Sequence, residues 1–144
     1  MLTDKELKEI LKSSKTIAVV GCSRDPEKDA YKVPKYLKEK GYKIIPINPF
    51  AEEILGEKVY KNLSEIKEEV DIVDIFRPSE ECLGIVKEAI KLKPKVIWMQ
   101  LGIENKEAEK LAKENKIKVV MNKCIMREHQ RFFEANDRFL KILI

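Results

Sequence analysis

The sequence predicts a doubly wound α/β fold, with about five parallel strands in one sheet and helices on both of its faces. Short apolar runs recur along the 144 residues, and segments with apolar residues at helical spacing separate them. The runs are continuously apolar rather than alternating, which is typical of parallel strands that are buried on both faces. No repeat, linker or low-complexity segment interrupts this order, so we expect one domain over residues 1–144.

A helix is predicted at the start of the chain. Thr3 and Glu6 have the spacing of a capping box, in which each side chain binds the backbone amide of the other residue. Leu7 and Ile10 then repeat at helical spacing, so the helix should bury one face and end near Ser13.

The first strand and its exit are central to the prediction. Residues 17–20 are apolar and end abruptly at Gly21, where the chain can leave the strand in a tight turn. Ser23 and its polar neighbours follow, and a second helix begins near Asp29. Unpaired amides and the positive end of a helix dipole converge in such a turn, which makes it an anion cradle. The turn has one glycine and therefore lacks the three-glycine dinucleotide fingerprint.

The second helix should place Ala30, Val33 and Leu37 on one buried stripe and end at Gly41. We expect Pro34 to lie in its first turn, where a missing amide hydrogen costs nothing.

The rest of the chain continues the alternation of strands and helices. Further strands are predicted at residues 42–47, 70–76, 95–99 and 117–120, helices at 62–67, 79–90 and 104–115, an irregular segment at 54–60, and helix after residue 124.

Ligands of doubly wound sheets bind beyond the carboxyl ends of the strands, where the strand order reverses. The segments expected there are Gly21 to Arg24, Asn48-Pro49, Phe76-Arg77-Pro78, Gln100-Leu-Gly102 and Asn122 to Cys124. They contain an anion cradle and several basic residues, but no Ser-His-Asp set and no carboxylate pair. This composition favours binding over catalysis, with no catalytic residue and no metal site predicted.

The overall composition narrows the functional class. The net charge is +4, from 29 basic and 25 acidic residues that are evenly mixed, so nucleic acid is not an expected partner. No apolar run approaches the roughly 18 residues of a membrane span, and we expect a cytoplasmic protein. Charged residues make up 38% of the chain, a proportion that resembles thermophile proteins. The three cysteines are widely spaced, which favours reduced thiols.

Taken together in order, the motifs resemble the single-domain CoA-binding proteins. These proteins are related to the nucleotide-binding domain of the succinyl-CoA synthetase α subunit and of ADP-forming acyl-CoA synthetases. The similarity covers roughly residues 4–130. It is carried by Thr16-Ile-Ala-Val-Val-Gly21 with Ser23, Tyr31-Lys-Val33, Ile47-Asn-Pro49, Leu55-Gly-Glu-Lys-Val-Tyr60, Val73-Asp-Ile-Phe-Arg77, Trp98-Met-Gln-Leu-Gly102 and Val120-Met-Asn-Lys-Cys124.

The resemblance implies a Rossmann-like fold that binds coenzyme A without catalysis, as a carrier, a sensor or a CoA site for a synthetase-type partner. By that likeness the turn from Gly21 to Ser23 would hold the pyrophosphate. The remaining implied contacts are Lys32 and Arg24 on phosphate, Val33 beside them, Asn48-Pro49 and Phe76-Arg77-Pro78 around the adenosine, and Gln100 to Gly102 along the pantetheine. The related synthetases also use a phosphorylated histidine, and this chain has one histidine outside those motifs, His129.

Two alternative functions stay open beside this interpretation. An NAD(P)-dependent oxidoreductase would carry an acidic residue after the second strand, where this chain has Asn48. Nucleic-acid binding would need a basic face with exposed aromatic residues. The apolar residues of the tail, 131–144, must pack on the domain or on another subunit, so a homodimer is a further expectation.

The cysteines near the predicted site suggest one reactive role. Cys22 stands where the family pattern has an apolar residue, beside a helix N-terminus and a basic residue, conditions that lower the pKa of a thiol. Cys22 or Cys124 could then form a mixed disulfide with the thiol of the ligand, although inert cysteines are favoured. Asp74 is expected to be a hydrogen-bonded structural residue and His129 a packing residue.

Overall fold

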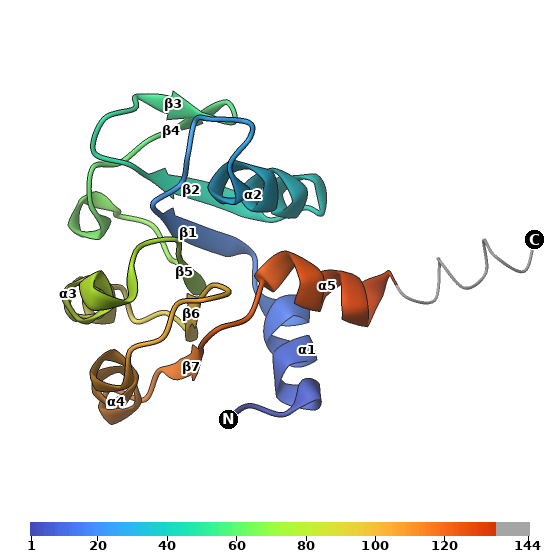
Figure 1. Ribbon diagram of the computed structural model, residues 1–144, viewed down its shortest axis with the longest axis vertical. Helices are drawn as coiled ribbons and strands as arrows, with labels where there is room; N and C mark the ends of the chain where they lie inside the picture. The colour runs from blue at the N-terminus through green and yellow to red at the C-terminus, as the bar shows by residue number, and fades with distance from the viewer. Residues whose placement is uncertain (135–144) are drawn as a thin grey trace, which may run out of the picture.

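The computed structural model describes residues 1–134 as one sheet of five strands with helices packed on both faces (Figure 1). The strands of this sheet are β1 (Thr16–Val20), β2 (Lys43–Ile47), β5 (Ile72–Ile75), β6 (Val96–Met99) and β7 (Lys118–Val120). A separate hairpin comprises β3 (Glu53–Ile54) and β4 (Glu57–Lys58). The helices are α1 (Asp4–Ser13), α2 (Asp29–Glu39), α3 (Cys82–Ala89), α4 (Lys106–Glu114) and α5 (Ile125–Phe133), with 3₁₀ turns η1 (Leu63–Glu65), η2 (Ser79–Glu81) and η3 (Ile90–Leu92).

All neighbouring strands of the sheet run parallel, in the order β2-β1-β5-β6-β7. The chain leaves β1 to form β2 on one side and then returns to form β5 on the other side of β1. The strand order therefore reverses between β1 and β5, which confirms the predicted doubly wound, Rossmann-like α/β fold.

The sheet separates two apolar cores (Figure 1). Helices α1, α2 and α5 cover one face, where Leu7, Val33 and Ile125 pack with alternate residues of the strands. Helices α3 and α4 cover the other face, where Val86 and Ala108 are fully buried. Because side chains of a strand alternate between faces, a strand in such a three-layer fold is largely apolar, and Asp74 on β5 is a buried exception.

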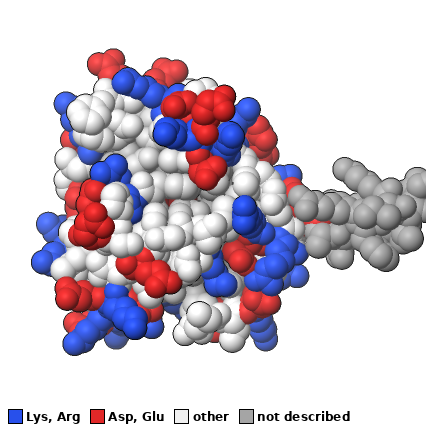
Figure 2. All heavy atoms as spheres, in the orientation of Figure 1, with Lys and Arg blue, Asp and Glu red and all other residues white. Residues whose placement is uncertain are grey.

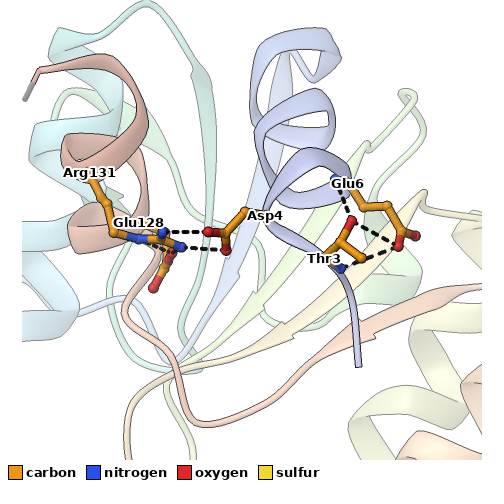
Figure 3. Close-up of polar contacts among 5 residues, drawn as sticks. All are labelled: Thr3, Asp4, Glu6, Glu128 and Arg131. Carbon is orange, nitrogen blue, oxygen red and sulfur yellow. Dashed lines mark hydrogen bonds and ion pairs between the residues drawn. The ribbon is translucent and has the colours of Figure 1, made fainter. Parts of the chain in front are cut away.

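Helix α1 begins with the predicted capping box. The Glu6 amide donates to the Thr3 hydroxyl at 3.2 Å, and the Thr3 amide donates to the Glu6 carboxylate at 3.3 Å (Figure 3). The first turn is also tied to α5, because the Arg131 guanidinium donates to both carboxylate oxygens of Asp4, at 2.9 and 3.0 Å. Arg131 also pairs with Glu128 on its own helix, so a three-residue ion network joins the two helices (Figure 3).

The expectation for Pro34 was wrong in an informative way. Pro34 is the sixth residue of α2 rather than a first-turn residue. In a regular helix its amide would donate to the carbonyl of Ala30, and proline has no amide hydrogen. The Ala30 carbonyl instead accepts a hydrogen bond of 3.0 Å from the amide of Ser23. The proline thus leaves an acceptor that fastens the turn after β1 to the second helix.

Three smaller elements differ from prediction or refine it. Residues 54–60 form part of the antiparallel hairpin β3–β4 rather than an irregular segment. The helix expected at 62–67 is only the short 3₁₀ turn η1. The chain after Cys124 is helical as α5, and the tail predicted to be helical beyond Glu134 lies outside the described residues.

Within residues 1–134, no helix is both long and apolar enough to cross a membrane.

Candidate functional site

The carboxyl ends of β1, β2, β5 and β6 bring most of the predicted site residues to one edge of the sheet. Gly21 follows β1, Asn48 follows β2, Phe76 follows β5 and Gln100 follows β6. The neighbouring exits of β1 and β5 form the switch point of the strand order. The sequence therefore predicted correctly that these segments lie on the same edge; what they bind is a separate question.

Gly21 is required where the exits of β1 and β5 meet. Its φ is +85°, a conformation that favours glycine. A Cβ atom there would lie 2.5 Å from the carbonyl oxygen of Phe76 and 2.9 Å from Cδ of Arg77. The Gly21 amide donates to the carbonyl of Ile47 at 3.1 Å. One residue without a side chain thus lets three strand exits approach one another.

The side chain of Asn48 holds the exit of β2 against the exit of β1. Its amide group donates to the carbonyl of Cys22 at 2.9 Å. Its side-chain oxygen accepts from the backbone amides of Phe50 and Ala51, at 2.8 and 3.1 Å. These bonds satisfy the side chain within the protein, so its observed role is to shape the loop from Pro49 onward.

The turn after β1 offers fewer amides than the sequence suggested. The amides of Gly21 and Ser23 donate to protein carbonyls, and that of Asp25 donates to the Ser23 hydroxyl at 3.0 Å. The amides of Cys22 and Arg24 have no acceptor among residues 1–134. An anion at this turn would therefore meet two amides of the turn and the N-terminal end of α2.

Three cationic side chains were predicted at the site, and their present partners differ. Arg24 and Lys32 are exposed, and neither forms an ion pair with a described residue. Arg77 donates to both carboxylate oxygens of Glu81, at 3.1 and 2.7 Å. The charge of Arg77 is thus already paired, whereas those of Arg24 and Lys32 are not paired with a described residue.

A pocket of about 160 Å³ opens between the exits of β5 and β6 and the first turns of α2 and α5. Its lining is mainly apolar and comprises Asp29, Val33, Phe76, Gln100, Leu101, Ile103, Cys124, Met126 and Arg127. Five residues from the predicted segments lie in this wall, namely Val33, Phe76, Gln100, Leu101 and Cys124. Arg127 and Met126 were missed, because they lie in the helix α5, which begins after the last strand-end motif.

Gln100 is buried beneath this pocket and links two elements. Its side-chain amide donates to Oδ1 of Asp74 on β5, and its side-chain oxygen accepts from the amide of Ile125 at 3.3 Å, where α5 begins. Asp74 is fully buried and its Oδ2 has no hydrogen-bond partner among the described residues. The expected structural aspartate is therefore only half satisfied. Burial raises its pKa to about 7 despite the bond from Gln100.

The structure favours an inert Cys22, as the sequence did, over a reactive one. Its side chain is fully buried in the core against α2 and α5. Burial, and then the nearby Asp74 carboxylate, raise the pKa of the Cys22 thiol to about 12. A position beside a helix N-terminus does not activate a thiol that faces the core. The thiol that lines the pocket belongs to Cys124, which is only partly buried.

The remaining predicted site residues are Gly102, Pro49 and Pro78, and His129 lies apart from them in the core. Gly102 has a φ of +84°, and its amide donates to the side-chain oxygen of Asn122 at 2.6 Å. Pro49 and Pro78 are exposed beside the strand exits. His129 is a packing residue, as expected, since it is buried among aromatic rings and its Nδ1 is bonded to the Tyr36 hydroxyl at 2.8 Å. Burial lowers the pKa of His129.

Charge on the visible face of the molecule is mixed rather than gathered by sign. In Figure 2, Lys and Arg side chains alternate with Asp and Glu around a centre of mostly uncharged residues. Within residues 1–134 no group of three His, Cys, Asp or Glu side chains is arranged to hold a metal ion.

The chain was compared with known families and proteins. A family model described as "CoA binding domain" matches residues 15–130. "Uncharacterized protein YneT" of Bacillus subtilis is 43% identical over 124 residues, which cover 86% of this chain and 92% of that protein. A solved structure, "cell-free ID.343 from Thermus thermophilus", superposes with a TM-score of 0.88 at 43% identity, over 92% of this chain and all of that one.

A longer relative contains a similar segment. "Acetate--CoA ligase [ADP-forming]" of Methanocaldococcus jannaschii is 33% identical over 150 aligned residues, which cover 96% of this chain but only 21% of the ligase. The chain thus spans about a fifth of that enzyme.

The burial of Asp74 predicts a specific pH dependence of stability. Its pKa is higher in the folded chain than in the unfolded chain, so the stability that it contributes is full below about pH 4 and is lost as the pH rises through about 7. In urea unfolding between pH 4 and 8, Asp74→Asn should remove this loss and be more stable than the parent at pH 8. A variant whose unfolding free energy follows the parent at every pH would contradict the assignment.

Asp71 provides the matched control for that experiment. Its carboxylate accepts from the amides of Lys15 and Thr16, at 2.8 and 3.0 Å, and these bonds hold its pKa below the usual value despite partial burial. The stability that Asp71 contributes is therefore present above about pH 4 and lost as the pH falls. Asp71→Asn should accordingly be less stable than the parent at pH 8, the opposite of Asp74→Asn.

The close approach at Gly21 predicts a large cost for any side chain there. Gly102 has nearly the same φ but nothing within 4 Å of an added Cβ, so Gly102→Ala measures backbone strain alone, about 1 kcal/mol. Gly21→Ala should cost at least about 2 kcal/mol more in urea unfolding, because the exit of β5 must move. Equal losses for the two variants would mean that the exits of β1 and β5 are not in contact as described.

Proposed function

Because the chain belongs to the CoA-binding domain family, we propose that it binds coenzyme A or an acyl-CoA non-covalently along the carboxyl edge of its sheet and catalyses no reaction by itself. Its role would be to carry, sense or protect CoA, or to provide a CoA site to a synthetase-type partner. The observation that carries the proposal is the mainly apolar pocket that opens beside the switch point and has the cation Arg127 in its lining.

The chemistry of CoA matches the order of features along this edge. The ligand has an adenosine 3′-phosphate at one end, a pyrophosphate in the middle and a long uncharged pantetheine arm, which contains two amides and ends in a thiol. Arg24 and Lys32 would neutralise phosphate charge beside the amides of Cys22 and Arg24. The pantetheine arm would enter the pocket past Val33 and Gln100. The adenosine would lie near Asn48-Pro49 and the segment from Phe76 to Pro78.

The same geometry supports CoA over NAD as the ligand. Sites for NAD use a carboxylate after the second strand to bind the ribose hydroxyls. Here that position is Asn48, whose side chain is already bonded to the Cys22 carbonyl and to two backbone amides. No acidic side chain takes its place directly at the exit of β2, since Pro49 and Phe50 follow.

Binding without ligase chemistry is supported by what surrounds the histidine. A phosphoryl carrier must expose a ring nitrogen to its substrate, whereas His129 is buried among Tyr36, Tyr42 and Phe133. Three other expectations from the sequence remain predictions: a cytoplasmic location, a thermophile source and a homodimer.

Calorimetric titration of the nucleotide-stripped protein tests the proposal. We expect micromolar or tighter binding of CoA, weaker binding of 3′-dephospho-CoA, and no binding of NAD. Lys32→Ala should weaken CoA binding about fivefold, because an exposed charge-assisted contact to phosphate is lost. Lys87→Ala, an equal loss of charge at an exposed position of α3, should leave the affinity unchanged.

Two results would count against the proposal. Heat on adding NAD but not CoA would return the site to the oxidoreductase alternative. Equal weakening by Lys32→Ala and Lys87→Ala would mean that the protein attracts CoA through its general charge rather than at the edge of the sheet.

A further inference from the structure

Large hydrophobic side chains are rarely exposed in the described part of the chain, and two of those that are lie on the carboxyl edge. Among the described residues only Met1, Phe50 and Leu101 are of this kind. Phe50 lies three residues after β2 and Leu101 two residues after β6, so both belong to the carboxyl edge. Leu101 lines the pocket, whereas Phe50 is 83% exposed. An exposed aromatic ring contributes nothing to the apolar core, and its apolar face is available to a ligand.

The backbone around Phe50 is firmly held although its ring is not. The Phe50 amide donates to the side-chain oxygen of Asn48 at 2.8 Å. The preceding residue is Pro49, whose ring fixes its own φ angle. The next residue, Ala51, is buried in the core, and its amide donates to the same oxygen. Asn48 in turn binds the Cys22 carbonyl. The loop therefore holds the backbone of Phe50 in place relative to the turn after β1, while its ring stays exposed.

The order of the strands places this ring at one end of the proposed ligand path. Along the edge the strands follow one another as β2, β1, β5 and β6. The exit of β2 carries Phe50, the exit of β1 carries the turn for the phosphates, and the exits of β5 and β6 flank the pocket. Coenzyme A has its parts in the same order: adenine, phosphates, pantetheine. With the pantetheine arm in the pocket, the adenine falls on the side of β2.

We propose that Phe50 is the platform on which the adenine base of CoA stacks, and that it determines the preference for the adenosine end of the ligand. The inference rests on the proposed function, because it takes CoA as the ligand of this edge. The chemistry suits an exposed ring, since every purine has an apolar π-face and stacking needs no hydrogen-bond partner. The stacking energy comes from removing one face of the phenyl ring and one face of the base from water.

Truncated ligands separate this contact from the rest of the site. We expect Phe50→Ala to weaken CoA binding about tenfold, the usual loss for one aromatic–base stack, and to leave 4′-phosphopantetheine, which lacks adenosine, unaffected. Phe50→Tyr and Phe50→Trp should retain CoA affinity. Leu101→Ala is the matched control: it removes the other exposed hydrophobic residue of the carboxyl edge and should weaken CoA and 4′-phosphopantetheine by the same factor, because both ligands carry the pantetheine arm.

A fluorescence readout reports the contact directly. The only tryptophan of the chain, Trp98, is fully buried, so its emission provides a constant background. In Phe50→Trp, CoA should quench the added emission, whereas 4′-phosphopantetheine should not.

The outcomes distinguish the two proposals. If the parent protein binds no CoA, the proposed function fails first. If the parent binds CoA and Phe50→Ala binds it equally well, Phe50 is not an adenine platform. The proposal also fails if Phe50→Ala leaves CoA binding unchanged but alters the sedimentation of the protein. That result would mean that the ring serves a contact between copies of the chain.

Discussion

The carboxyl edge of this sheet depends on a contact that only a residue without a side chain permits. The Phe76 carbonyl oxygen lies 2.5 Å from where a Cβ of Gly21 would be, so the exits of β1 and β5 meet at Gly21. Around this contact, backbone and side-chain bonds fix the neighbouring exits: Gly21 to the Ile47 carbonyl, and Asn48 to the Cys22 carbonyl. The edge is therefore set by short polar bonds between loops as much as by the apolar core beneath it.

The same bonds determine what the edge can offer to a ligand. Two amides of the turn after β1 are used inside the protein, one of them by the Ala30 carbonyl that Pro34 leaves without a helical donor. A proline in the second turn of α2 thus shapes a phosphate-type turn several residues earlier in the chain. What remains is a shallow arrangement of two amides, exposed cations and an apolar pocket. On the proposed function, this arrangement would hold a long ligand with a phosphate centre.

Much of the fold could be predicted from the sequence, because burial on both faces of a parallel sheet requires continuous apolar runs such as residues 17–20. The carboxyl-edge segments followed from the ends of those runs. The direction in which single side chains point could not be predicted. Cys22 lies two residues after β1, but its side chain is buried in the core. Its position near a helix N-terminus therefore does not lower the pKa of its thiol, which burial raises. Arg127 and Met126 reach the pocket from a helix that the strand pattern does not place.

The central claim is that CoA occupies the carboxyl edge, and amide chemical shifts during a CoA titration test it most directly. The 16.8 kDa chain is small enough for assigned ¹⁵N spectra. We predict that the largest shifts fall at residues 21–24, 48–50, 76–78 and 100–102, while the opposite edge, around Lys15, Asp71 and Lys95, stays unchanged. Shifts confined to that opposite edge, or spread evenly over the surface, would contradict the account.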